Sequence, residues 1–550
     1  MSFCITSSFQ RKLIRPKQSP TSTDNSLTEM DSGPKTSVSY KDFSVTRLEE
    51  ACDESARPSS FTTESCFEDS ALLDEEAHKA EPNYRASLRA KGPRLESCQG
   101  IHLYESDVEL DCTDLKALLE KAQSLLKEGI ACGVYGAKID DATMAFLSSR
   151  VLCSHVLESE NSTIFLRGQA REVLVRVWIH EAELNLVLFR FKEVKAALWE
   201  AVAHHKILVD LQKSAAAQQH TPFADCMISA SDLAVLEADI MRCFSVVDYR
   251  LGDDGHKTWD EKGTALLQKV LHEEPNHTEA KSLLSLFLSY RITTGDVDGE
   301  SAVEDCVQAI DWLGDLYEQH SESPNHELHS RRLSVVLRLA SYAFREVGRF
   351  EEATEAVKGA LDIIKVLCNQ RPRAVIHLFE LYHCNCALAE HLEQSDDDDR
   401  FILDARIEAA AALTSLTELL PEVPKFWRSL TQCLIDVADL QERGGLESGT
   451  NEQLEPLPLQ TSSRAVEAAV RCISCASTPS FEDYVEYSRA LLERGRHSYI
   501  RKLYLGMYTY GACRVLLFYS DDSTAVISFL CQKMLQNITS ARWKYTRAQF

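Results

Sequence analysis

The chain has 550 residues, a formal net charge of −25 and 44% hydrophobic residues. This length exceeds what one simple core needs and suits an extended array or several domains. Its 21 Gly and 15 Pro are too few for a turn-rich all-β protein. The negative charge repels phosphate backbones, so we expect no nucleic-acid groove. No apolar run approaches the ~20 residues that span a bilayer, so we expect no membrane insertion.

The N-terminus and the cysteines bear on the compartment. The first twenty residues lack a long apolar core, so a secretory signal is not expected. Their basic residues Arg11, Lys12, Arg15 and Lys17 fit a mitochondrial presequence or a plain basic arm. The 18 Cys are scattered through apparently helical segments, which is typical of reduced thiols used as small buried side chains. We therefore expect a cytoplasmic or nuclear protein, with the mitochondrion as the alternative.

Three segments differ in composition. Residues 1–110 are rich in Ser, Thr, Pro, Asp and Glu and poor in large aliphatic residues, which predicts a disordered acidic arm. Residues 111–541 carry helical periodicity almost throughout and predict the folded part. Residues 542–550 form a short basic tail.

Apolar residues recur at three- and four-residue intervals along the folded part, and glycine and proline mark the breaks. We predict a break at Gly129–Gly136, a linker at Gly444–Thr461 and a capping box in which Ser480 and Asp483 begin a helix. The periodicity predicts helices over residues 115–126, 140–157, 231–251, 259–272, 277–290, 301–317, 373–393, 402–420, 426–440, 463–476, 504–518 and 524–536.

The clearest unit is Leu337–Leu361, within a predicted helix pair at 327–367. It consists of two short amphipathic helices joined at Gly348, where a left-handed cap is expected because glycine adopts it without steric cost. A pair this small cannot bury its apolar stripe alone. The sequence therefore predicts further copies stacked against it.

This unit resembles a tetratricopeptide repeat (TPR). Two other stretches resemble the same repeat but match fewer of its positions. Trp178–Ala201 has Phe189 where the turn glycine is usual, and Tyr484–Tyr504 has Gly495 there. We count roughly seven to nine helix pairs, at an interval longer than the ~34 residues of the family. The matching residues of the clearest unit are Leu337, Ala340, Ser341, Phe344, Gly348, Phe350, Ala353 and Val357.

The resemblance implies an all-α fold, an α-solenoid in which antiparallel helix pairs form a right-handed superhelix. It also implies that the first helices line a groove for a peptide or a partner helix. In the clearest unit Arg338, Tyr342 and Arg345 lie off the buried stripe and are candidates for that groove. The alternative is that they are ordinary solvent-facing residues.

Two groups of residues have side chains capable of thiol or metal chemistry. Cys472 and Cys475 form a lone CxxC, but they lie in a helical context rather than at a strand-to-helix turn, so buried thiols are the favoured interpretation. His383, Cys384 and Cys386 are metal-capable, but no second cluster supplies the four ligands that zinc needs.

Other candidates are weaker. His204-His205 also lacks partner ligands, and Thr294–Glu300 matches only part of a calcium loop. There is no phosphate-binding loop, dinucleotide fingerprint or nucleophile elbow. We expect no cofactor and no metal.

The sequence favours a non-catalytic scaffold or adaptor that binds other proteins. One alternative keeps the scaffold and makes it a regulatory subunit of a cell-cycle or chromosome-associated assembly. Another, from a different class, is a thiol- or metal-dependent enzyme that uses Cys472 and Cys475 or the His383 cluster.

Overall fold

The computed structural model describes eight stretches of the chain. These are residues 114–133, 135–217, 228–294, 299–319, 325–395, 399–443, 457–476 and 479–497. The predicted arm at 1–110, the predicted helices at 504–518 and 524–536, and the tail at 542–550 lie outside the described residues.

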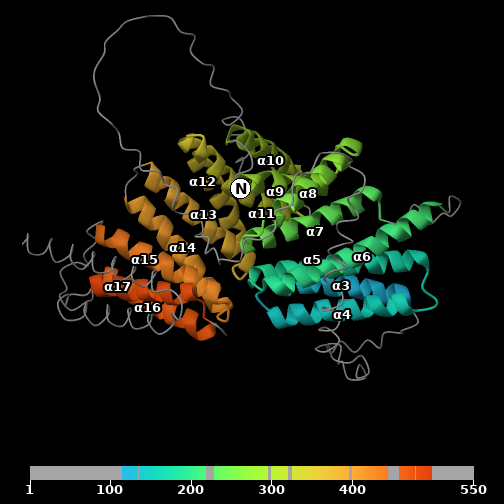
Figure 1. Cartoon of the computed structure of the whole chain (residues 1–550), viewed down its shortest axis with the longest axis horizontal. Helices are drawn as coiled ribbons and strands as arrows, with labels where there is room; N and C mark the ends of the chain where they lie inside the picture. Colours follow the sequence, from blue (N-terminus) through green and yellow to red (C-terminus); the bar gives the residue numbers. More distant parts are fainter. Residues whose placement is uncertain are drawn as a thin grey trace, which may run out of the picture. The chain divides into compact units, whose positions relative to one another are not determined.

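The regular structure of the described residues is entirely α-helical (Figure 1). None of these helices is long and apolar enough to cross a membrane. The helices are α3 (Leu115–Gly133), α4 (Ile139–Glu158), α5 (Ile164–Val187), α6 (Phe191–Ala217), α7 (Ala230–Leu251), α8 (Gly255–Glu273), α9 (Thr278–Thr294), α10 (Gly299–Gln319), α11 (His326–Glu346), α12 (Phe350–Gln370), α13 (Val375–Gln394), α14 (Asp399–Leu419), α15 (Pro424–Arg443), α16 (Leu457–Cys475) and α17 (Phe481–His497).

Consecutive helices pack as antiparallel pairs, and each pair packs on the next. The most extensive packing joins α3 with α4, α5 with α6, α7 with α8, α11 with α12, α13 with α14 and α15 with α16, whereas α10 packs about equally on α9 and α11. The first helices of neighbouring pairs are also in contact. For example, α9 contacts α11, and α11 contacts α13. The predicted all-α array of helix pairs is confirmed for the described residues.

The apolar stripe read from Leu337–Leu361 is the surface that holds this pair together. Leu337, Phe344, Ala353 and Val357 are all buried, and Phe344 is 0% exposed. Burying a side chain of this size stabilises the fold by roughly 1.5–3 kcal/mol. The stripe therefore accounts for the packing of α11 on α12.

Gly348 adopts the predicted left-handed conformation, with φ +77°. Arg349 N–H donates to the Phe344 carbonyl at 2.8 Å and Gly348 N–H to the Arg345 carbonyl at 2.9 Å. These bonds satisfy carbonyls that the end of α11 would otherwise leave without a partner. The turn glycine of the clearest unit is confirmed.

The substitution Gly348→Ala is expected to lower the free energy of unfolding by ~1–2 kcal/mol, because a Cβ atom crowds the following carbonyl when φ is positive. No atom lies within 4 Å of the place that this Cβ would take, so the loss comes from the backbone. Urea unfolding followed by circular dichroism measures it. The control Gly359→Ala, inside α12, is expected to be neutral or to stabilise by up to ~1 kcal/mol. Equal effects of the two substitutions would contradict the explanation.

Three predicted boundaries are wrong. The predicted break at Gly129–Gly136 does not begin at Gly129, because α3 continues to Gly133. A Cβ on Gly129 would lie 2.5 Å from the Phe146 ring. That glycine permits close approach of α4 rather than a turn. The helix predicted from residue 463 begins at Leu457, inside the predicted linker. Helix α17 runs past Gly495, which is therefore not a turn glycine.

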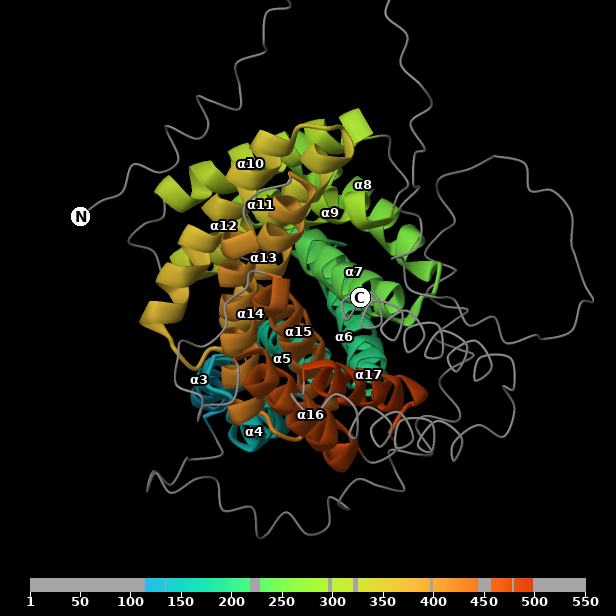
Figure 2. The same cartoon turned by 90° about the vertical axis from the view of Figure 1, so that its left-hand side faces the viewer.

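The first two pairs and the last pairs share one hydrophobic cluster. It joins buried residues of α3, α4 and α5 with residues of α13 to α17, which lie beside one another in Figure 2. The Phe189 ring lies 6.1 Å from that of Phe379 and 5.8 Å from that of Phe426. The Tyr135 ring lies 5.5 Å from that of His377. Segments far apart in the sequence therefore close on each other through aromatic side chains.

Candidate functional site

The first helices of successive pairs touch in the order α5, α7, α9, α11 and α13, and we call the surface that these helices and α15 present the first-helix face. Arginine–carboxylate bridges cross it between successive pairs. Arg242 of α7 donates to Glu183 of α5 at 2.7 Å, and Arg332 of α11 to Glu279 of α9 at 2.8 Å. The arginine side chains of these bridges are 12% and 8% exposed. Removing the carboxylate partner would therefore leave a poorly solvated arginine charge. The bridges fix the register of one pair against the next.

The predicted groove residue Arg338 belongs to such a bridge. Its Nε and Nη2 atoms donate to the two carboxylate oxygens of Glu380 on α13, at 2.6 and 3.2 Å. The side chains are 13% and 8% exposed. Arg338 therefore holds α11 on α13, and its charge is already compensated within the chain.

The other two predicted groove residues, Tyr342 and Arg345, lie about one and two turns further along α11. Tyr342 packs edge-on against His391 at 5.6 Å, and the Arg345 guanidinium lies 5.0 Å above the Tyr342 ring. Arg345 also pairs with Glu390 at 3.6 Å and keeps 24% of its side chain exposed. Tyr342 and Arg345 stay predicted contact residues, since both present some surface to solvent.

Phe189 has a strained backbone at the turn between α5 and α6. Its φ of +57° is rarely adopted by a residue with a Cβ. The hydrogen bonds match those at Gly348, because Arg190 N–H donates to the Asn185 carbonyl at 2.9 Å. The strain, typically ~1–3 kcal/mol, persists only where surrounding contacts offset it. Here those contacts are Phe379 and Phe426 of the shared cluster.

Two polar side chains contact this aromatic cluster, and a third residue is the sequence neighbour of one of its members. The Arg250 guanidinium at the end of α7 lies 5.4 Å above the Phe189 ring. His383 of α13 packs edge-on against Phe379 at 4.4 Å. Lys425 is the neighbour of Phe426 at the beginning of α15. Periodicity reasoning did not identify Arg250 or Lys425, and the only sequence signal was the missing turn glycine at position 189.

The predicted metal-capable cluster at residues 383–386 diverges in space. His383 packs among aromatic rings, whereas the Cys384 thiol is buried and donates to Glu380 at 3.5 Å. Burial, followed by the charge of Glu380, raises the pKa of Cys384 well above its usual value. Among the described residues, no three or more His, Cys, Asp or Glu side chains gather as metal ligands.

His204 and His205 also diverge. His205 hydrogen-bonds to the Leu233 carbonyl at 3.0 Å, and His204 contacts Arg171. Burial, with the charge of Arg171, lowers the pKa of His204 to about 4. Both side chains therefore hold helices together. The partial calcium loop at Thr294–Glu300 lies mostly outside the described residues.

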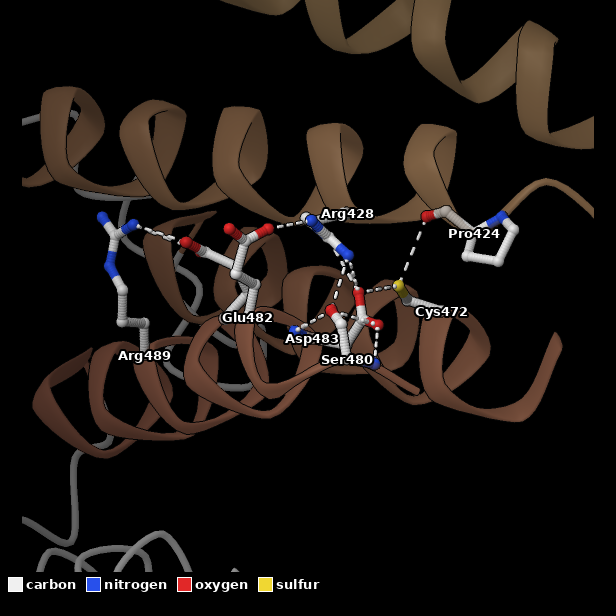
Figure 3. A network of polar contacts seen from close by, with 8 residues as sticks. Pro424, Arg428, Cys472, Ser480, Glu482, Asp483 and Arg489 are labelled. Atoms are coloured by element: carbon white, nitrogen blue, oxygen red, sulfur yellow. Dashed lines mark hydrogen bonds and ion pairs between the residues drawn. The ribbon is translucent and has the colours of Figure 1, made fainter. Parts of the chain in front are cut away.

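Cys472 of the CxxC joins a polar network between α15, α16 and α17 (Figure 3), whereas the Cys475 thiol donates to the Cys472 carbonyl within α16. The Cys472 thiol donates to the Asp483 carboxylate at 3.1 Å and lies 3.3 Å from the Pro424 carbonyl. Arg428 Nε donates to the same Asp483 oxygen at 2.8 Å. Burial, followed by the hydrogen bond and charge of Asp483, raises the pKa of Cys472 to about 12. The thiol is therefore protonated at neutral pH, which argues against a nucleophilic or redox role.

The predicted capping box is confirmed in this network. Ser480 N–H donates to Asp483 Oδ2 at 2.7 Å, and Asp483 N–H donates back to Ser480 Oγ at 3.3 Å. Burial opposes ionisation of Asp483, but bonds from Cys472 and Ser480 and the charge of Arg428 lower its pKa. One carboxylate thus begins α17 and ties it to the two preceding helices.

We expect Cys472 to alkylate slowly. With a pKa of about 12 against the ordinary 9.0, its reaction with iodoacetamide at mildly alkaline pH should be about a hundred- to a thousandfold slower than in the urea-unfolded chain, because only the thiolate reacts. Peptide mass spectrometry over time measures both rates. Equal rates in the folded and unfolded chains would contradict a protonated thiol held by Asp483.

The chain matches no family model and no curated protein. Several solved helical structures align with most of it. The Rap protein complexed with Competence and Sporulation Factor is 13% identical, with 79% of this chain and 96% of that chain covered and a TM-score of 0.34. An IFIT1 monomeric mutant with Gppp-AAAA is 12% identical, covering 80% and 88%, with a TM-score of 0.28. The P58(IPK) TPR domain is 11% identical, covering 78% and 99%, with a TM-score of 0.18.

Proposed function

We propose that the chain is a non-catalytic scaffold that binds a segment of another protein on its first-helix face. The observation that carries this proposal is that reactive and charged side chains of the chain bond to one another across neighbouring helices. Cys472 donates to Asp483, and Arg338 and Arg332 bridge to Glu380 and Glu279. These bonds hold the helices in register. The helices held in this way form one surface that successive first helices line.

Tyr342 and Arg345 are the proposed partner contacts on α11. Their ring and guanidinium stack at 5.0 Å, which is a preorganised amphipathic surface of the kind that anchors interfaces. Arg338 supports them by holding α11 on α13. The alternative of a regulatory subunit in a cell-cycle or chromosome-associated assembly, and the cytoplasmic or nuclear location, stay predictions.

The test is reconstitution with a purified partner. Affinity capture with the full chain selects candidates, and calorimetry with each purified candidate gives its dissociation constant. Binding should survive Cys472→Ser and weaken in Tyr342→Ala and Arg345→Ala, with the exposed Arg373→Ala as the matched control. Turnover of a small molecule that Cys472→Ser abolishes, in a chain that binds no candidate, would overturn the proposal.

A further inference from the structure

Arg250 lies at the meeting point of the first and last pairs, and one of its N–H donors has a hydrogen-bond acceptor among the described residues. Its Nη1 atom donates to the Leu186 carbonyl at 3.3 Å, and its guanidinium lies 5.4 Å above the Phe189 ring. A guanidinium has five N–H donors, and stacking on an aromatic face orients it without consuming them. Among the residues that the structure describes, Arg250 has no carboxylate partner.

Lys425 precedes Phe426 of the same aromatic cluster, and it lies within electrostatic reach of both Arg250 and His383. Phe426, the next residue, packs 5.8 Å from Phe189. Within the described part of the chain, no carboxylate pairs with the Lys425 ammonium group. The carboxylates that act on it electrostatically, Glu482 and Asp483, both bond to Arg428 instead.

His383 completes the group from α13. Its ring packs at 4.4 Å from Phe379 and 4.8 Å from Tyr382, and no hydrogen bond to its nitrogens is found among the described residues. Burial, followed by the charges of Arg338, Arg250 and Lys425, lowers its pKa well below the usual value. The imidazole is therefore neutral and keeps an N–H donor.

The electrostatics of Lys425 agree with this geometry. The residue is reached by solvent, but desolvation by the surrounding protein, followed by the charges of Arg428 and Arg250, lowers its pKa. Desolvation is also the main cause that lowers the pKa of Arg250. Arg250 and Lys425 therefore lie within electrostatic reach of each other in a chain whose net charge is −25.

We infer that Arg250, Lys425 and His383 form a recognition site for an oxyanion, a carboxylate or phosphate group carried by a protein segment, between α7, α13 and α15. Arg250 and Lys425 supply charge-assisted hydrogen bonds, and His383 supplies a neutral donor. The Phe189–Phe379 surface beside them suits an apolar side chain next to the anion. A long polyanion is disfavoured, because the net charge of the whole chain repels it.

This inference rests on the proposed function, since it names the chemistry of the partner segment, but it can be tested without any partner. Calorimetry at low salt measures binding of sodium pyrophosphate, of a short peptide of alternating Glu and Leu, and of a single-stranded RNA oligonucleotide to the full chain. Pyrophosphate and the peptide should bind. Lys425→Gln and Arg250→Gln should each weaken binding by at least about tenfold.

The matched controls are Lys365→Gln on α12 and Arg471→Gln on α16, both exposed and expected to change nothing. An effect of the controls equal to that of the site variants, or no binding of either small probe, would overturn the site. RNA binding tighter than peptide binding, or pyrophosphate binding without peptide binding, would overturn the protein-segment assignment.

A second measurement uses the unaltered chain. Burial and the charge of Arg338 lower the pKa of His383, and Arg250 and Lys425 add to them. An anion bound by Arg250 and Lys425 should therefore raise this pKa, and histidine NMR of the chain with and without pyrophosphate measures the change. An unchanged pKa under saturating pyrophosphate would contradict the site. If a captured partner binds the wild-type chain and the double variant Arg250→Gln/Lys425→Gln equally, the result supports the scaffold and contradicts the anion site.

Discussion

The substitution Glu380→Ala is expected to lower the free energy of unfolding by ~3–5 kcal/mol, because it leaves the charge of Arg338 without its partner in a poorly solvated place. Both N–H···O bonds of this bridge are lost at once, and the two side chains are only 13% and 8% exposed. The Cys384 thiol also loses its acceptor. Urea unfolding monitored by circular dichroism gives the change.

Two comparisons make this result specific. The exposed pair Lys116–Glu120 keeps 79% and 66% of its side chains in solvent, so Glu120→Ala should cost less than ~0.5 kcal/mol. The double variant Arg338→Met/Glu380→Leu should regain most of the loss, since apolar side chains of similar volume often replace a buried ion pair without cost. A Glu380→Ala loss no larger than the Glu120→Ala loss would contradict the assigned role of the bridge.

The substitution Phe426→Ala is expected to destabilise the chain by ~3–5 kcal/mol and to loosen the contact between the first and last pairs, because it leaves a cavity in a packed cluster. Phe426 is 1% exposed and lies 5.8 Å from both Phe189 and Phe379. Without this contact the strained conformation of Phe189 loses its support. Hydrogen exchange by mass spectrometry should show faster exchange at the end of α5 as well as in α15.

The control is Phe350→Ala, at the beginning of α12, where the ring is 47% exposed. Its loss should cost less than ~1 kcal/mol, since little buried area is removed. Exchange at the end of α5 should not change in this variant. Unchanged exchange there in Phe426→Ala would mean that the aromatic contact does not close the array.

Local signals were sufficient for the helix pairs and for some of their ends. The left-handed cap at Gly348 and the capping box of Ser480 and Asp483 appear as predicted. Each depends on atoms within a few residues, so spacing along the chain specifies it. Glycine was a weaker signal than it looked, because Gly129 serves close packing on Phe146 while Phe189 occupies a turn that glycine usually fills.

The sequence by itself therefore determined the fold class, the pairing of neighbouring helices and the buried stripes, which follow from periodicity. The tertiary structure alone decided which charges meet. Arg338 reads as a groove residue from its place off the stripe, but it bonds to Glu380 on the next pair. It also decided that Phe189 meets Phe426 and that Arg250 lies over the same cluster. Such contacts depend on the rotation accumulated from one stacked pair to the next, which no single stretch of residues encodes.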